Sequence, residues 1–431
     1  MTSNFREEQP AQRTLVQDAA RLEDVRLKHQ RIRCVLEAAN ADAVLLQDPA
    51  NIAWFTAGTD LLRCGADGGS TSVFITREAR LFATNSVDSA QIFEREAFGL
   101  GFQLKQREWF KPHSELITDL CRGRRVISDR GPEGTVAEQK LISEVRLPLT
   151  DLEVDRLRLL STVAVHAVEA TAHNLRAGVT ESEVAGEVSH RLLKRTVAVG
   201  RIQVCADGRN DRYRHWTFGE QPIQNYAVIS CVARRWGLHV GVTRTVCLEK
   251  VPKDLWAVYQ KAALVHSTGM FFSRDKSTLG DVWQKVHRIY EKFDIGNEWQ
   301  LADQANVLGY SKSECQLIPG STWQLQAPVP VFWHPSVGPA LLGDTVLCRE
   351  SSNEILTASA SWPQIPIQVK GREVSCPGIL LLKSDKSTDE AVACIDHPDE
   401  EIPSPLESVW EMRVPPEAIA MGREKSTWSE S

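Results

Sequence analysis

Hydrophobic residues in the first third of the chain change between helical and strand spacing. From Val25 they recur at the intervals of an amphipathic helix, and the short apolar run 43–46 then ends at the turn signal Asp48-Pro49. The pattern also predicts strands over 72–76, 80–83 and 126–128 and a helix over 86–96. Because helices and strands alternate over 21–147, we expect one α/β domain with its own core.

A break in this pattern just before Thr150 introduces two long helices. Thr150 is placed to cap the first of them, and Glu153 stands where it would complete a capping box. A second helix is predicted to start at Thr180, after a glycine that suits a helix end. We therefore expect a domain boundary at residue 150, with domains over 22–150 and 151–382.

The second half of the chain carries further elements and ends in a polar segment. The pattern predicts strands over 201–204, 226–230 and 237–239, helices over 252–272 and 279–293, and short strands with Pro and Gly punctuation up to residue 382. Residues 1–21 form a polar leader. Residues 383–431 are acidic and contain many Pro and Ser residues, so we expect a partly disordered tail.

Composition narrows the class of protein. Of 431 residues, 42% are hydrophobic and 25% are charged, as in ordinary globular chains. The formal net charge of −6 and the absence of a basic block argue against nucleic-acid binding. The longest apolar runs are far shorter than the roughly 20 residues that span a bilayer, and the first 20 residues lack a secretory signal pattern, so a cytoplasmic protein without a membrane partner is expected. The ten Cys residues form no CxxC pair and suit reduced thiols.

Three stretches resemble a known family. Residues 41–58 are similar to the N-terminal domain of creatinase and prolidase, 175–181 to the link between the first two helices of the second domain, and 237–246 to a central strand of that domain. Over about 22–382 the chain resembles the pita-bread family of Xaa-Pro aminopeptidases, prolidases and creatinase. The resemblance implies an α/β N-terminal domain followed by an α+β pita-bread C-terminal domain, and a homodimer.

The family's peptidases hold two metal ions with two Asp, one His and two Glu, which together activate a water molecule. Placed on that pattern, the five ligand positions of this chain fall at Ser230, Gly241, Asp303, His334 and Gly343. None of them keeps the ligand of the family. Since glycine has no side-chain donor and Ser is a poor substitute for a bridging carboxylate, we expect no paired metal centre and no other cofactor. A single metal held by Asp303 and His334 is the alternative.

His215 falls where the resemblance places a substrate-contacting histidine, which in creatinase acts without a metal. An imidazole can exchange a proton near neutral pH, so His215 is the candidate acid/base; the alternative is a histidine hydrogen-bonded in a loop. Arg214, Arg235 and Arg244 are candidates for binding a substrate carboxylate, with ordinary salt bridges as the alternative. Glu314 is a further candidate or a surface charge. Asp303 and His334 are otherwise expected to be exposed polar residues.

Two functions of different classes remain open. The first is a metal-independent hydrolase that cleaves a C–N bond in a small molecule or short peptide, with His215 as acid/base. The second is a catalytically silent pita-bread protein that binds a ligand or partner in the old cleft. A third and weaker reading is a metal-dependent Xaa-Pro aminopeptidase with rearranged ligands. The resemblance favours a hydrolase in general, but it does not choose the substrate.

Overall fold

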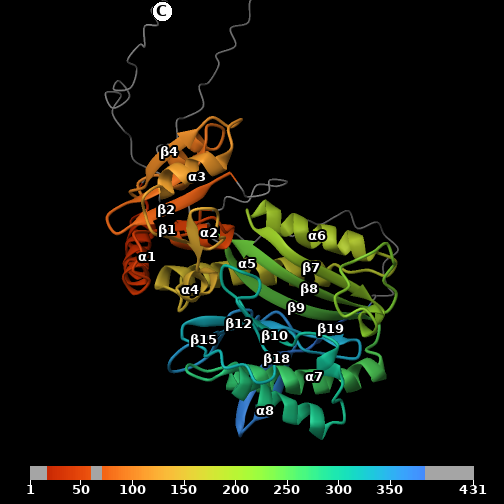
Figure 1. The fold of residues 1–431 in the computed structure, drawn as a ribbon. Helices are drawn as coiled ribbons and strands as arrows, with labels where there is room; N and C mark the ends of the chain where they lie inside the picture. The colour runs from red at the N-terminus through yellow and green to blue at the C-terminus, as the bar shows by residue number, and fades with distance from the viewer. Residues whose placement is uncertain (1–16, 60–69, 384–431) are drawn as a thin grey trace, which may run out of the picture.

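The computed structural model describes residues 17–59 and 70–383 (Figure 1). Most of the predicted leader 1–21, and all of the predicted tail 383–431 except Lys383, lie outside the described residues. None of the helices within the described ranges is both long and apolar enough to cross a membrane.

The N-terminal part is built around a six-stranded sheet in the order β4-β3-β2-β1-β5-β6. Its strands are β1 (Ala43–Leu46), β2 (Ser72–Thr76), β3 (Arg80–Asn85), β4 (Gln103–Arg107), β5 (Val126–Ser128) and β6 (Thr135–Ala137). Its helices are α1 (Ala19–Ala38), α2 (Pro49–Phe55), α3 (His113–Cys121) and α4 (Gln139–Glu144). All four residues of β1 are buried because β1 lies inside the sheet, paired with β2 and β5. The predicted α/β class of this part is confirmed.

Two capped helices open the C-terminal part. The Thr150 hydroxyl accepts a hydrogen bond from the backbone N–H of Glu153, whose carboxylate accepts from the backbone N–H of Thr150, so the predicted capping box is present at the start of α5 (Asp151–His173). Thr180 and Glu183 make the same box at the start of α6 (Glu181–Lys194). Each box satisfies backbone N–H groups that a helix start would otherwise leave unpaired.

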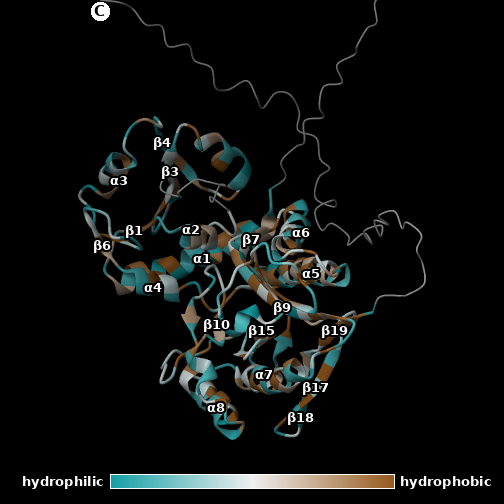
Figure 2. Ribbon diagram, turned by 90° about the vertical axis from the view of Figure 1, so that its right-hand side faces the viewer, coloured by the Kyte–Doolittle hydropathy of each residue, from teal (hydrophilic) through white to brown (hydrophobic). Residues whose placement is uncertain are grey.

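The C-terminal part packs α5 and α6 on one face of a four-stranded sheet, in the order β19-β9-β8-β7 (Figure 1). Its strands are β7 (Ala198–Ala206), β8 (Tyr226–Arg235), β9 (Leu238–Leu248) and β19 (Ile379–Leu382). The other face looks toward a second sheet, β11-β10-β12-β15-β16, with helices α7 (Lys253–Phe272) and α8 (Leu279–Lys292) beyond it. Figure 2 shows hydrophobic residues along β9, where both faces are covered.

The second sheet comes from the predicted closing section. Its strands are β10 (Ala305–Val307), β11 (Cys315–Gln316), β12 (Val329–Trp333), β15 (Asp344–Cys348) and β16 (Glu354–Ile355). Two short hairpins complete the region: β13 (Ser336–Val337) with β14 (Ala340–Leu341), and β17 (Gln364–Val369) with β18 (Arg372–Pro377). The expected pita-bread architecture thus has its two sheets facing each other.

Some elements differ from the sequence prediction. The strands predicted over 226–230 and 237–239 are the long hairpin β8–β9, joined at Trp236 and Gly237, which both have positive φ. The full length of β9 was not predicted, because small and polar residues interrupt its apolar pattern. The helix predicted over 86–96 is a single π-helical segment, Gln91–Glu96, and the polar edge strand β4 was not predicted because it lacks apolar alternation.

Candidate functional site

Alternate residues of β7, β8 and β9 form the floor of the candidate site. Ser230 lies opposite Gln203 on β7 and Thr243 on β9, and Gly241 lies opposite Val232. Residues opposite each other in an antiparallel sheet point to the same side, so these positions share the face that looks toward β12 and β15. The strand period therefore brings two of the predicted ligand positions, Ser230 and Gly241, to one face.

A β-bulge in β7 adds an arginine to this face. Val199 pairs with Ala233, but the next residue to pair is Arg201, opposite Val232, so Gly200 is the extra residue. A Cβ at Gly200 would lie 2.9 Å from the carbonyl oxygen of Val232. Because one extra residue reverses which side the following residues face, the bulge turns Arg201 toward the site.

Five of the predicted site residues line one small cavity. They are Arg214, His215, Ser230, Asp303 and His334, and Arg201 lines it as well. The cavity has a volume of about 10 Å³, which is room for about one water molecule. The sequence thus predicted five of the eleven lining residues of a site that the fold brings together from β7, β8, the loop after β7, the segment before β10 and the end of β12.

An aromatic ring fills the space beside the two glycine positions. A Cβ built on Gly241 would lie 2.5 Å from ring carbons of Phe332, and one built on Gly343 would lie 2.9 Å from the same ring. Phe332 is 1% exposed and packs with Val232 and Leu308. Real Cβ atoms do not approach other atoms this closely, so neither glycine position can carry a larger residue while the ring keeps its place.

The two-metal centre of the family does not fit these residues. Two of the five positions lack a side chain, and the ring of Phe332 occupies the volume that carboxylates there would need. Within residues 17–59 and 70–383 there is no group of three or more His, Cys, Asp or Glu side chains placed to hold a metal ion. At the remaining pair, the Asn306 amide nitrogen contacts both Asp303 (2.7 Å) and His334 (2.9 Å).

Asn306 also fixes the protonation of His334. Its amide nitrogen donates to Nε2 of His334, so this ring nitrogen is an acceptor and the imidazole is neutral. Burial lowers the pKa of His334 to about 4, although Asp303 opposes the shift. Burial alone would raise the pKa of Asp303, but His334, the Asn306 hydrogen bond, His215 and Arg201 hold it below its usual value. The expectation that Asp303 and His334 are exposed is wrong: His334 is 5% exposed and Asp303 is mostly buried.

His215 stands at the mouth of the cavity, in the loop after β7. Its side chain is 62% exposed, and its Nε2 lies 3.5 Å from Oδ1 of Asp303. An imidazole with a carboxylate behind one nitrogen and open space around the ring has the arrangement of a general acid/base.

The two arginines of the cavity differ in whether the guanidinium is already ion-paired within the protein. Arg214 donates to the carbonyl oxygen of Gly338 at 2.7 Å and forms an ion pair of 3.0 Å with Glu298. The buried Nε atoms of Arg201 and Arg214 both lack a hydrogen-bond partner among the described residues, but in that part of the chain Arg201 forms no ion pair like that of Arg214 with Glu298. Burial lowers the pKa of Arg201, while the charge of Asp303 raises it. Arg201 is therefore the cation of this cavity that is open to a ligand. Sequence reasoning missed it, although its two-residue spacing from Gln203 was a usable signal.

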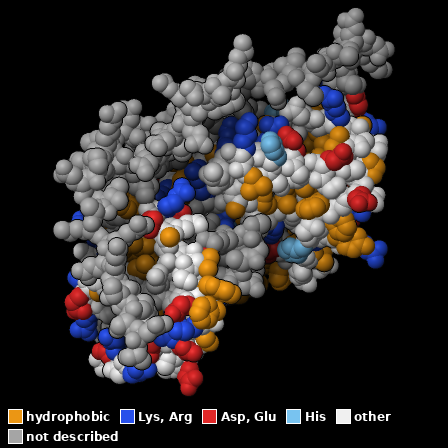
Figure 3. Space-filling model, turned by 90° about the horizontal axis from the view of Figure 1, so that it is seen from above, with side chains coloured by type: hydrophobic (Ala, Val, Ile, Leu, Met, Phe, Trp, Pro, Cys, Tyr) orange, Lys and Arg blue, Asp and Glu red, His pale blue; other side chains and the backbone are white. Residues whose placement is uncertain are grey.

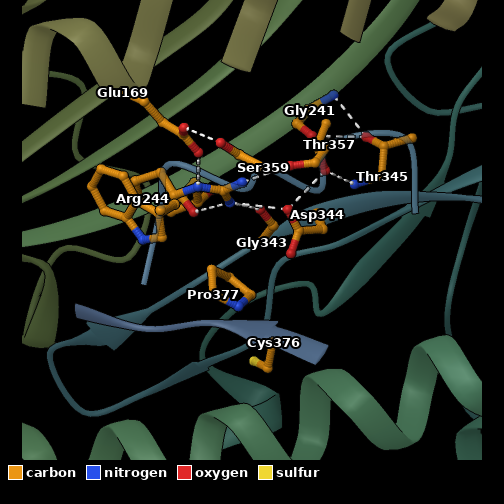
Figure 4. A network of polar contacts seen from close by, with 12 residues as sticks. Glu169, Gly241, Arg244, Gly343, Asp344, Thr345, Thr357, Ser359, Cys376 and Pro377 are labelled. Carbon is orange, nitrogen blue, oxygen red and sulfur yellow. Dashed lines mark hydrogen bonds and ion pairs between the residues drawn. The ribbon is translucent and has the colours of Figure 1, made fainter. Parts of the chain in front are cut away.

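Arg244 belongs to the opposite face of the sheet (Figure 4). Arg244 pairs with Ile229, whereas the neighbouring pair is Ser230 with Thr243, and successive residues of a strand point to opposite faces. Arg244 is 1% exposed. Its Nε donates to Glu169 and its Nη1 to Asp344, at 2.8 and 2.9 Å. Of the two readings from the sequence, the structure favours the salt bridge over substrate binding, because the guanidinium does not line the cavity and all its edges face protein acceptors.

The last two candidates also lie outside the wall of the cavity. The guanidinium of Arg235 stacks over the ring of Trp236, with 4.3 Å between its central carbon and the ring centroid. Glu314 is 6% exposed and ion-paired with Arg146. The reading of Glu314 as a surface charge is therefore wrong, and both residues are committed to protein partners.

The sequence pattern of metallopeptidase family M24 matches residues 155–315, which include α5, the β7–β9 sheet and β10. The chain has the pita-bread fold, and the sequence match to this family covers its residues 155–315. The match agrees with the resemblance read from 175–181 and 237–246. A comparison with curated protein sequences finds no match.

Solved structures with this fold superpose on most of the chain. The Xaa-Pro dipeptidase of Bacillus anthracis is 17% identical with a TM-score of 0.68, covering 83% of this chain and 100% of its own. The X-Pro aminopeptidase of Thermotoga maritima is 14% identical with a TM-score of 0.66, covering 82% and 99%. The N-terminal domain of the FACT complex subunit SPT16 of Cicer arietinum is 10% identical with a TM-score of 0.61, covering 78% and 96%. Such identities show the shared fold, so the reaction must be argued from the site.

Proposed function

We propose that this pita-bread protein works without the two-metal centre of the M24 peptidases, as a hydrolase of a C–N bond in a small molecule or short peptide. The observation that carries the proposal is the ring of Phe332 beside Gly241 and Gly343. A site that holds no bridging carboxylates has to activate water with its own acid and base groups.

The acid/base work is assigned to His215. As water attacks the carbon of the scissile C–N bond, Nδ1 of His215, the ring nitrogen that does not face Asp303, takes a proton from it and then returns that proton to the leaving nitrogen. Asp303, 3.5 Å away, is assigned to orienting the ring and stabilising its protonated form. Arg201 is assigned to a carboxylate of the substrate, in place of Arg235 and Arg244, because it lines the cavity without an ion pair of the kind that holds Arg214. A homodimer in the cytoplasm is part of the same proposal.

Turnover measured with and without metals tests this assignment. The purified protein is incubated with creatine and with Xaa-Pro dipeptides, in a chelator or with added Mn²⁺ or Co²⁺, and the amine products are quantified by mass spectrometry. The expected result is turnover that chelators leave unchanged and that His215→Ala abolishes. His190→Ala, an exposed histidine on α6, is the matched control and should keep full activity. Metal-stimulated turnover, or two metal ions bound per chain, would contradict the proposal.

The second candidate is a catalytically silent protein that binds a ligand or a partner in this cleft. The cavity volume of about 10 Å³ argues against turnover, since a dipeptide cannot enter without rearrangement, and so does the engagement of Arg214 with Glu298. The SPT16 domain, named as part of a complex, has the same fold. Binding of the test compounds by calorimetry, with no product from any of them, would favour this candidate over the hydrolase.

A further inference from the structure

A second cavity lies on the far side of the β7–β9 sheet, between α5 and the segment 356–361. Its volume is about 400 Å³, far larger than the cavity at His215. Part of its wall is apolar, with Val165 from α5 and Leu356 opposite. Neither Lys nor Arg is among its lining residues in the described part of the chain, and its single acidic residue is Glu169.

Glu169 is a buried carboxylate with one oxygen on the side of this cavity. Glu169 as a whole is 4% exposed. Oε1 accepts from Nε of Arg244, and Oε2 accepts from the hydroxyls of Ser359 and Ser361 at 2.6 and 3.2 Å, as Figure 4 shows for Ser359. Both serines line the cavity. Because hydroxyl donors are neutral and can rotate, Oε2 can exchange them for a charged donor from the cavity.

The buried group around Arg244 contains more negative than positive charge. The guanidinium lies between two carboxylates, Glu169 and Asp344, at 2.8 and 2.9 Å. The basic group His266 lies 3.7 Å from Asp344, and burial lowers the pKa of His266 to about 4. His266 is therefore neutral at pH 7, and one positive charge faces two negative ones. A buried surplus charge is costly unless a partner compensates it.

We propose that the cavity beside Glu169 binds a small organic cation, an alkylammonium or guanidinium compound. Its charged nitrogen donates to Oε2 of Glu169, and its carbon chain lies along Val165 and Leu356. The volume of about 400 Å³ and the apolar part of the wall suit an organic molecule rather than a bare ion. This site is separate from the cleft at His215, so it stands whether or not the protein hydrolyses a substrate.

Calorimetric titration with n-butylammonium tests the proposal, with n-butanol as the uncharged probe of the same length. Thr162 lines the cavity from an exposed position on α5, and its hydroxyl donates to the carbonyl oxygen four residues earlier. Thr162→Tyr should fill the cavity without touching Glu169. The matched control is Thr118→Tyr on α3, where an exposed threonine makes the same hydrogen bond. Glu169→Gln removes the charge and keeps the shape.

We expect n-butylammonium to bind the unaltered protein and Thr118→Tyr equally well. Thr162→Tyr and Glu169→Gln should each weaken its binding by about tenfold or more, and n-butanol should bind more weakly by a similar factor, since a charged hydrogen bond is lost. Equal binding of the two probes would overturn the proposal, as would unchanged binding by Thr162→Tyr or no binding by the unaltered protein. Thr162→Tyr keeps the test decisive if Glu169→Gln fails to fold.

Discussion

The two faces of the β7–β9 sheet differ in which charged side chains they bury. On the face toward β12, Ser230 and Gly241 stand where we predict the family's metal-binding carboxylates, and the ring of Phe332 fills the space beside Gly241. On the face toward α5, Arg244 keeps its charge and is enclosed by carboxylates and carbonyl oxygens (Figure 4). A buried charge is tolerated only with its partners, so removing one member of a buried ion pair leaves the other member destabilising.

Charged side chains on the molecular surface do not show the difference seen between the two buried faces of the sheet. Figure 3 shows one outer face, where Lys and Arg side chains alternate with Asp and Glu among small hydrophobic patches on the described residues. Water screens these charges, so they need no enclosed partners. The buried positions on the two faces of the sheet are therefore where substitutions test the comparison.

The largest effect is expected from Arg244→Met. Removing this guanidinium leaves Glu169 and Asp344 buried without their cation, which should lower the free energy of unfolding by about 3–5 kcal/mol. Urea denaturation measures the change. Arg235→Met, which removes a guanidinium stacked on Trp236, is the control and should cost about 1 kcal/mol or less. A similar small cost for Arg244→Met would show that the α5 face does not depend on its charges.

The packing of the other face is tested by Gly241→Ala. The added methyl group meets the Phe332 ring at 2.5 Å and should cost about 1–3 kcal/mol of stability. In a Phe332→Leu background the same change should cost clearly less, which a double-mutant cycle in urea measures. The control is Gly186→Ala, a helix position where a Cβ meets nothing within 4 Å. Equal costs in both backgrounds would mean that the ring does not fill this space.

The pH dependence of stability tests the neutral state of His266, which lies on α7 next to Asp344. Its pKa is about 4 when folded and 6.5 as the ordinary value, so between these pH values the unfolded chain binds a proton that the folded chain does not. Stability therefore falls as the pH drops from 6.5 toward 4, by about 1.4 kcal/mol per pH unit for each such proton. His239 and His334 shift in the same direction.

His266→Gln should make this slope shallower by about one proton, measured as the free energy of unfolding at several pH values. His190→Gln, at an exposed position on α6, should leave the slope unchanged. An unchanged slope in His266→Gln would mean that folding does not lower the pKa of His266, and His266 would then add positive charge to the group around Arg244 below pH 6.5.

The smallest effect is expected from Ser230→Ala, again on the face toward β12. The Ser230 hydroxyl accepts a hydrogen bond of 2.8 Å from Thr243. Losing this neutral contact should cost about 1 kcal/mol in urea denaturation. Val228→Ala, on the same strand and the same face, is the control for loss of side-chain volume. A loss as large as that of Arg244→Met would show that this neutral hydrogen bond matters to stability as much as the charges around Arg244.

Local signals in the sequence carried much of the fold. The capping boxes at Thr150 and Thr180 and the helices α5 and α6 follow from patterns within a few residues, and the structure has them. The length of β9 did not follow, because a strand covered on both faces lacks alternation and Arg244 interrupts its apolar run.

The sequence predicted those features of the candidate site that depend on the residue type at one position. It did not predict those that depend on contacts between side chains of different strands and sheets. The sequence determined that Gly241 and Gly343 offer no side-chain donor and that Ser230 is a poor substitute for a bridging carboxylate, since both follow from the side chains themselves. It also marked His215, Asp303 and His334, which the fold brings to one cavity. Only the tertiary structure decided that Phe332 fills the space beside the glycines, that a bulge at Gly200 turns Arg201 inward, and that Arg244 faces α5. The reason is physical: residue type fixes which chemistry a side chain can offer, whereas strand register and packing fix which partners it meets.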